Sequence, residues 1–561
     1  MPRLQSDLCG FRKRSRAVFI AVVLAATSLS TAPSWAGSAT DLPEIYSVPG
    51  GYLFDNVVQY RNDDDHFKYG SLGGERGYNA QIGFGLPYWI WVAMPELFPE
   101  YLPDKIPGQG LKAFGYIYEK GRDPRFQLPI GTSQRQNLGI DRVWINCGAC
   151  HTGTVRETPE SEPQIVLGMP ANRYNQGAWG KFLFDCAADE KFTPDRLLFK
   201  IREMEKERRK LVSQGKLQGS YLPPELSYVD EWIFKAFVIP TMRNRLLELR
   251  SRLSYIDFTS WGPGRVDTWN TPKGLLNFPM DKAPQAEKKG NTDFPSVWHQ
   301  LGRVGMQLHW DGNNDSVHER NLSASFAGTI PATLDKCSLR RIAHYLETLA
   351  PPPFPAAKID RALAARGEPI YNRVCANCHG APTPPFRGPG EAWKTVGTVI
   401  PLNKIGTDRW HFDSYTPELA KAQNSLYSGY PLANSRACPG DPASKDYPAR
   451  FSHFRKTDGY AASPLDGIWL RAPYLHNGSV PSLRMLLEPS ANRPKDFWIG
   501  YDVYDYKNVG FVTDSPEAKA QGWHYDTTQT ANGNQGHEGR AYGTELSPEE
   551  KDALIEYLKT F

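Results

Sequence analysis

The chain has 561 residues, of which 40% are hydrophobic, 12% aromatic and 22% charged, with a formal net charge of +4. This length exceeds what one hydrophobic core usually serves, so we expect two or three domains. The composition is typical of soluble globular proteins, and the small net charge gives no support for a nucleic-acid-binding protein.

Residues 1–36 predict a secretory signal peptide. Basic residues from Arg12 to Arg16 precede an apolar run, Ala17 to Leu29, that is too short to span a bilayer comfortably, and Ala36 is a small residue suited to cleavage. Removal of this segment brings the net charge close to zero. No later stretch resembles a transmembrane helix, so we expect a periplasmic or secreted protein without an integral membrane segment.

Residues 37–130 are rich in Gly, Pro, Tyr and Trp and have few periodic runs. They predict an irregular N-terminal extension with short strands or turns. The domain that follows, residues 131–350, contains a helical segment over 193–255, where apolar residues recur every three or four positions. A turn at Gly219 to Pro224 divides this segment. We interpret it as a scaffold hairpin, in preference to a membrane or partner role for its basic face.

The chain contains two motifs of the form Cys-x-x-Cys-His, at Cys147, Cys150 and His151 and again at Cys375, Cys378 and His379. Two thiols three positions apart on a helical turn can each take one vinyl group of the same porphyrin, and the next residue then lies below the iron. A redox dithiol or half of a zinc site does not require that histidine. The sequence therefore predicts two covalently bound haem c groups with iron, each with a proximal histidine.

The proline run 351–355 predicts a domain boundary, after a helix over 339–349. Residues 351–561 then predict a C-terminal cytochrome c domain, with a helix over 362–371 leading to Cys375 and a closing helix over 547–558 that begins with a capping box of Ser547 and Glu550. The expected fold class is mainly α, with two cytochrome c-type haem domains, long irregular loops and the N-terminal extension.

Three further cysteines, Cys186, Cys337 and Cys438, follow the signal segment. Because three is an odd number, they allow at most one internal disulfide bond and leave one thiol free. The sequence does not say which two would pair.

Three further segments carry a resemblance to a known family: Trp310-Asp311-Gly312, Ala472 to Ser479, and the Leu546-Ser547-x-Glu opening of the last helix. Together with the two haem motifs they resemble the bacterial di-haem cytochrome c peroxidase superfamily, which includes the MauG-type enzymes. The length, an Asn after Trp-Asp-Gly, and Gly536-His537-Glu538 are more similar to the branch of di-haem rubber oxygenases and fatty-acid dioxygenases. The resemblance covers roughly residues 130–561.

The resemblance implies roles for four residues. Trp310 would lie between the two haems and couple them, and Phe326 would be the apolar residue across the first haem. His537 would be the sixth ligand of the second haem; His476 is the alternative, and otherwise would lie near the haem edge. Where peroxidases of the family have a Gln and a catalytic Glu, this chain has Arg320 and Ile330.

The missing Glu favours an O2-dependent dioxygenase that acts on a small apolar alkene over a peroxidase that reduces H2O2 with electrons from a small cytochrome. In the peroxidase hypothesis Glu319 is a candidate replacement acid. A non-catalytic electron carrier would need a second ligand at the first haem, for which His309 and His318 are candidates. MauG-like oxidation of a partner protein is a fourth hypothesis.

Overall fold

The computed structural model describes residues 48–49, 56–57, 62–72, 85–137, 139–217, 222–330, 334–388, 393–426 and 450–561. The chain divides into two compact units, Met1–Leu42 and Pro43–Phe561, and every described residue belongs to the second. The predicted signal peptide therefore lies outside the described residues. Within the described part, no helix is both long enough and apolar enough to cross a membrane.

The N-terminal part of this unit is more regular than the sequence predicts. Helix α2 (Asp63–Tyr69) precedes α3 (Tyr88–Leu97), and the antiparallel sheet β3 (Leu86–Pro87), β5 (Ile140–Ile145), β4 (Thr132–Asn137) has the order β3-β5-β4. Residues Tyr88 to Pro95 of α3 are all buried. A helix that is apolar on every side has no amphipathic period, which explains why this segment resembles an irregular one in the sequence.

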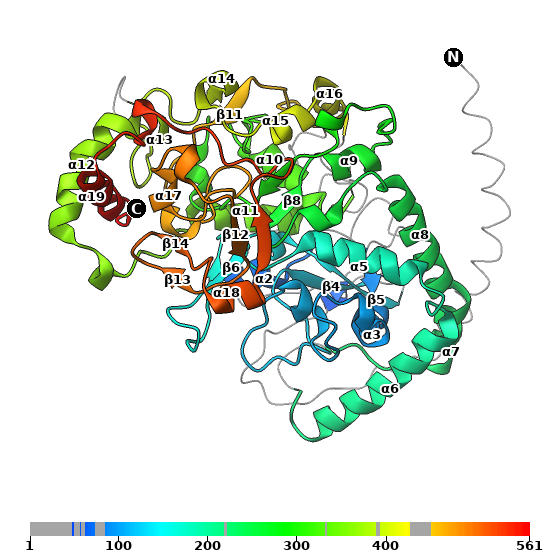
Figure 1. The fold of residues 1–561 in the computed structure, drawn as a ribbon. Helices are drawn as coiled ribbons and strands as arrows, with labels where there is room; N and C mark the ends of the chain where they lie inside the picture. Colours follow the sequence, from blue (N-terminus) through cyan, green and yellow to red (C-terminus); the bar gives the residue numbers. More distant parts are fainter. Residues whose placement is uncertain are drawn as a thin grey trace, which may run out of the picture. The chain divides into compact units, whose positions relative to one another are not determined.

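The predicted helical hairpin is present as four consecutive elements, drawn from cyan to green in Figure 1: α6 (Pro194–Ser213), α7 (Tyr228–Ile233), a π-helical turn η3 (Phe234–Val238) and α8 (Ile239–Arg252). Thr193 caps α6 by accepting from the Arg196 backbone N–H. The apolar residues Leu197, Leu198 and Ile201 are buried, as the periodicity predicts. Helix α8 packs against α5 (Gln176–Ala188).

The helices around the second motif also agree with the sequence. Helix α12 (Arg361–Val374) leads into α13 (Ala376–His379) and packs against the closing helix α19 (Pro548–Leu558), which begins with the predicted capping box of Ser547 and Glu550. Gly367 lies where α12 and α19 cross. A Cβ there would lie 2.0 Å from the Ala553 carbonyl oxygen, so only glycine permits this close approach.

The other described helices and strands are short and joined by long loops. The helices are α9 (Asn270–Leu275), α10 (Val317–Ser325), α11 (Lys336–Thr348), α14 (Leu402–Ile405), α15 (Trp410–Ser414), α16 (Pro417–Ser425), α17 (Leu483–Leu486) and α18 (Pro516–Gln521). The two-stranded antiparallel sheets pair β1 (Val48–Pro49) with β2 (Asn56–Val57), β6 (Thr152–Val155) with β7 (Gln164–Leu167), β8 (Arg265–Asp267) with β9 (Asn291–Asp293), β10 (Val399–Pro401) with β11 (Gly459–Ala461), β12 (Asp496–Ile499) with β15 (Trp523–Asp526), and β13 (Tyr504–Asp505) with β14 (Gly510–Phe511).

One hydrophobic core crosses the proline run at which the sequence predicts a domain boundary. It joins Val155, Val166, Met169 and Trp298 to apolar residues between Phe354 and Phe561. Residues on both sides of the proline run thus share one core. The division of the chain into a first haem domain, residues 131–350, and a C-terminal cytochrome c domain, residues 351–561, stays a prediction. Of the three further cysteines, Cys337 is disulfide-bonded, Cys186 is a free buried thiol and Cys438 lies outside the described residues.

Candidate haem sites

The first Cys-x-x-Cys-His motif is connected to the end of α2 by hydrogen bonds. Cys147 to Cys150 form the short helix α4, capped by Asn146, whose side chain accepts from the Gly148 N–H at 2.9 Å. The same amide donates to the main-chain oxygens of Lys68 and Gly70, at 3.1 and 2.9 Å. These bonds fix the start of the motif against the end of α2. Asn146 is not among the residues predicted from the sequence, although an Asn before a helix is a capping signal.

His151 follows α4 and has the features of a metal-ligating imidazole. Its Nδ1 lies 2.8 Å from the Pro295 carbonyl oxygen, which orients the ring and leaves Nε2 as the coordinating atom. Burial lowers the pKa of His151 to about 3, so the ring is neutral at physiological pH. A neutral imidazole is the form that binds a metal.

The second motif repeats this arrangement at the end of α12. The Nδ1 atom of His379 lies 2.8 Å from the Ser463 carbonyl oxygen, and burial lowers the pKa of His379. All four motif cysteines are free thiols, so none is used in a disulfide bond. Both motifs therefore present two thiols and one oriented imidazole, the donor set that attachment of haem c requires.

A second imidazole faces His379. The ring centres of His379 and His537 are 6.3 Å apart, and burial lowers the pKa of His537 to about 3. Two imidazoles that share a metal, with metal–nitrogen bonds of about 2 Å each, have ring centres roughly 6 Å apart. The pair would therefore fit a haem iron between the two rings, and the assignment of His537 as the sixth ligand of the second haem stays a prediction.

The chain holds His537 in an unusual backbone conformation. Its φ of 48° lies in the left-handed region, which is unusual for a residue other than glycine and is found at functional sites. The His537 N–H donates to the Ile405 carbonyl at 2.7 Å, and the Arg493 guanidinium donates to the carbonyls of Asn534 and Gly536, at 2.5 and 2.9 Å. Arg493 could not be predicted from the sequence, because no local pattern shows that an arginine side chain will bind main-chain carbonyls.

The surroundings of His151 differ from those of His379. Among the described residues, no second imidazole ring pairs with His151 as His537 pairs with His379. His318, one of the two candidates to close this site, lines a small pocket between α10 and α11 instead. His309, the other candidate, has its Nδ1 2.6 Å from Asn313 Oδ1 and its ring 5.9 Å from that of Trp269.

Trp310 is hydrogen-bonded to both segments that orient the proximal histidines. Its indole Nε1 donates to the Asp293 carbonyl at 2.8 Å, two residues before Pro295. Its own carbonyl accepts from the Ala461 N–H at 2.8 Å, two residues before Ser463. These two bonds connect Trp310 to both segments, and its place between two haems stays a prediction.

Two side chains of the α10 region lie close to the first motif. Phe326, the C-cap of α10, packs in the same apolar cluster as Cys147, and its ring centre is 5.8 Å from that of Phe451. Burial lowers the pKa values of His151 and His309 and raises the pKa of Cys147, and the positive charge of the Arg320 guanidinium acts on all three in the lowering direction. Burial also lowers the pKa of Arg320 itself to about 10. The first site is therefore apolar, with one cation beside it.

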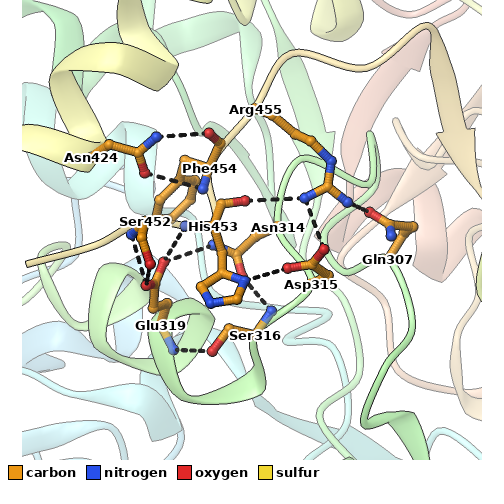
Figure 2. A network of polar contacts seen from close by, with 10 residues as sticks. All are labelled: Gln307, Asn314, Asp315, Ser316, Glu319, Asn424, Ser452, His453, Phe454 and Arg455. Atoms are coloured by element: carbon orange, nitrogen blue, oxygen red, sulfur yellow. Dashed lines mark hydrogen bonds and ion pairs between the residues drawn. The ribbon is translucent and has the colours of Figure 1, made fainter. Parts of the chain in front are cut away.

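Glu319, the candidate replacement acid, is occupied by hydrogen bonds. The residue is 3% exposed, and its carboxylate accepts from the backbone N–H groups of Ser452 and His453, at 2.8 and 3.0 Å, and from the Ser452 hydroxyl. Figure 2 shows these contacts beside a second set, in which Asp315 binds His453 and Arg455. Both carboxylates fix residues 452–455 against α10, and the contacts of Glu319 are those of a structural residue.

His476 lies in a different group of aromatic rings from His379. Its Nε2 is 3.2 Å from the Tyr460 hydroxyl, and its ring centre is 4.3 Å from that of Tyr460 and 6.0 Å from that of His411. The structure thus brings His537 to His379 and places His476 with Tyr460 and His411.

A comparison with known proteins supports the interpretation of this chain as a c-type cytochrome. Residues 459–499, which include Ser463 and His476, match the family model described as RoxA-like, cytochrome c-like. The match supports a link to RoxA-like cytochromes c, and a cytochrome c-like domain implies covalently bound haem c with iron. It covers neither Cys-x-x-Cys-His motif, so the number of haems and the wider placement among di-haem peroxidases and MauG-type enzymes stay predictions.

Two curated relatives are uncharacterized proteins of Sinorhizobium fredii (strain NBRC 101917 / NGR234). The chain is 33% identical to y4iJ over 252 residues, which are 38% of this chain and 41% of the relative. It is 33% identical to y4iM over 296 residues, 48% of this chain and 64% of the relative. The matched part thus spans less than two thirds of either relative, and neither name carries an activity.

Proposed function

We propose that the chain is an exported di-haem c-type oxidoreductase that uses O2 to oxidise an apolar alkene at the haem of Cys147, Cys150 and His151. The observation that carries the proposal is that the two sites differ in whether a second imidazole faces the motif histidine. His379 is faced by His537 at 6.3 Å, whereas His151 has no such imidazole partner among the described residues. A haem with two histidine ligands suits electron storage, and a haem with one suits reaction with small molecules.

The haem of the first site would supply the iron chemistry with O2. In the proposed reaction the C=C bond of the alkene and the O=O bond of O2 break, and two C=O bonds form. All atoms and electrons of both reactants appear in the two carbonyl products, so no external reductant is consumed.

Three side chains of this chain have separate roles in the proposal. Phe326 packs against the same apolar cluster as Cys147 and would keep water from the apolar side of the first site. Arg320 provides a positive charge near His151, which favours anionic ligands there. Trp310, hydrogen-bonded to both segments that orient the proximal histidines, couples the two sites.

Reduction of H2O2 is the second candidate function. Arg320 favours it, because a cation near the haem stabilises negative charge on a departing oxygen. Peroxide cleavage also requires a group that moves a proton, and the neighbouring Glu319 is bound to two backbone N–H groups. The contacts of Glu319 therefore favour the dioxygenase.

The deciding experiment compares two assays on the purified holoprotein. We expect O2 uptake that depends on an added apolar alkene, with carbonyl products in the ratio of two per O2 consumed. Stopped-flow oxidation of a reduced small cytochrome c by H2O2 should stay at the rate without the protein. Rapid cytochrome oxidation without alkene-dependent O2 uptake would establish the peroxidase instead.

A further inference from the structure

Six large apolar side chains are exposed on the described part of the helical hairpin, and one of them, Val212, lies at the C-terminal end of α6. The other five are Phe199 on α6, Tyr228, Val229 and Trp232 on α7, and Phe237 on η3, with exposed fractions of 61%, 94%, 57%, 53% and 50%. We call these five residues the aromatic patch. Exposure of single apolar residues is ordinary, but grouped aromatic residues mark an interaction surface.

Two ion pairs join the face of α6 that carries Phe199 to α7 and η3. Asp195, Phe199 and Arg202 lie at i, i+4 and i+7 on one face of α6. Asp195 binds Lys235 on η3 at 2.5 Å, and Arg202 binds Glu231 on α7 at 2.7 Å. Phe199 therefore lies between two contacts that border Trp232.

The π-helical turn brings the last member into the aromatic patch. Trp232 and Phe237 are five residues apart, a spacing that places side chains side by side in a π-helix but not in an α-helix. Their ring centres are 5.6 Å apart, in an edge-to-face arrangement. Single π-helical turns are frequent at functional sites.

The hairpin also has an excess of basic residues. Residues 194–252 contain thirteen Lys and Arg and eight Asp and Glu, whereas the sequence without the predicted signal segment has a net charge close to zero. Aromatic residues combined with Lys and Arg are typical of protein segments at the interface between water and lipid, where the rings lie among the headgroups and the basic side chains attract anionic lipids.

We infer that the aromatic patch docks this protein onto the surface of an anionic lipid bilayer. The inference revises the sequence expectation of a scaffold hairpin, because the periodicity that buries Leu197 and Ile201 does not reveal that Trp232 and Phe237 face outward. It is independent of the reaction proposed above. The rings enter only the headgroup region, in keeping with a surface contact.

Co-sedimentation with vesicles tests the inference on the intact holoprotein. We expect binding to vesicles of equal parts phosphatidylglycerol and phosphatidylcholine at low salt, and much weaker binding to pure phosphatidylcholine or at high salt. The variant Phe199→Ser/Trp232→Ser/Phe237→Ser should bind the anionic vesicles at least about tenfold more weakly, since each aromatic ring contributes through the apolar area that it buries.

The matched control is Leu301→Ser/Val304→Ser, which removes two apolar side chains of similar exposure, 59% and 63%, far from the hairpin in sequence. It should bind vesicles as the unchanged protein does, and both variants should keep the haem absorbance spectrum. Binding that is absent, independent of lipid charge or unaffected by the triple variant would overturn the inference. Self-association that the triple variant abolishes, without vesicle binding, would assign the aromatic patch to a second copy of the chain and also overturn it.

Discussion

The histidine of each motif, the expected proximal ligand, is oriented by a main-chain carbonyl. The Nδ1 atoms of His151 and His379 lie 2.8 Å from the carbonyls of Pro295 and Ser463. Hydrogen bonds of this kind fix the tautomer and ring orientation of metal-ligating imidazoles. The sequence predicted both ligands but not their partners, because any residue type can offer a main-chain carbonyl.

Arg320 tests whether the first site accepts anions. Replacement of Arg320 by Leu should weaken azide binding to the ferric holoprotein by about tenfold or more, since one nearby positive charge contributes more than ~1.4 kcal/mol in a partly buried site. Arg320→Lys keeps the charge and should retain most of the affinity. Optical titration measures both. Equal azide affinity in Arg320→Leu and the unchanged protein would remove Arg320 from the site.

Asp311, beside Trp310, should make stability depend on pH. Burial raises the pKa of Asp311 to about 7, although the charge of Lys456 opposes the shift. The unfolded chain releases this proton near pH ~4, so between pH ~4 and about 7 the folded protein binds more protons. Its contribution to stability is therefore full below pH ~4 and is lost as the pH rises to about 7.

The variant Asp311→Asn should remove that loss. Its free energy of unfolding, relative to the unchanged protein, should rise by up to a few kcal/mol between pH 5 and pH 8. Urea unfolding at the two pH values measures the difference, and other titrating groups cancel in the comparison. A gap between the two proteins that stays constant with pH would contradict the raised pKa of Asp311.

At the scale of elements, helix α12 connects the second haem motif to the closing helix. The chain continues from α12 directly into Cys375, and Gly367 allows α12 to cross α19 closely. The positions of both helices could be predicted, because amphipathic periods and a capping box are local signals. Their crossing depends on Ala553, which is far away in sequence, and could not be predicted.

Substitution of Gly367 by Ala separates packing from helix propensity. Alanine normally stabilises a helix by about 0.5–1 kcal/mol relative to glycine. At Gly367 the added Cβ meets the Ala553 carbonyl, so we expect a loss of about 1–3 kcal/mol. Gly180→Ala in α5 is the matched control, since its Cβ meets only Phe258 at 3.6 Å. Thermal or urea unfolding measures both, and a stabilised Gly367→Ala variant would contradict the close crossing.

The hairpin shows a second limit of prediction at this scale. Its helices follow from the spacing of Leu197, Leu198 and Ile201. The π-helical turn and the outward direction of Trp232 depend on how α7 packs on its neighbours, which no local pattern records. Helix α3 differs, because the helix itself could not be predicted: residues Tyr88 to Pro95 are buried on every side, so the sequence shows no amphipathic period.

At the scale of the whole molecule, the two candidate haem sites belong to one compact unit and are connected by a shared hydrophobic core and by hydrogen bonds of Trp310. A single hydrophobic core joins residues on both sides of the proline run, and Trp310 is hydrogen-bonded toward both sites. The spacing of the motifs predicts the attachment residues, whereas the pairing of His379 with His537 brings together residues 158 positions apart. That pairing followed from the family resemblance and not from the residues alone.

Electron paramagnetic resonance of the ferric holoprotein tests the central claim, that one haem is open and the other closed. We predict two components of equal amount: a low-field high-spin signal from the haem of His151 and a low-spin signal from the haem of His379 and His537. The variant His537→Ala should convert the low-spin component to high spin, and added imidazole should restore it. Two low-spin signals in the unchanged protein would mean that both haems are closed, and would contradict a catalytic first site.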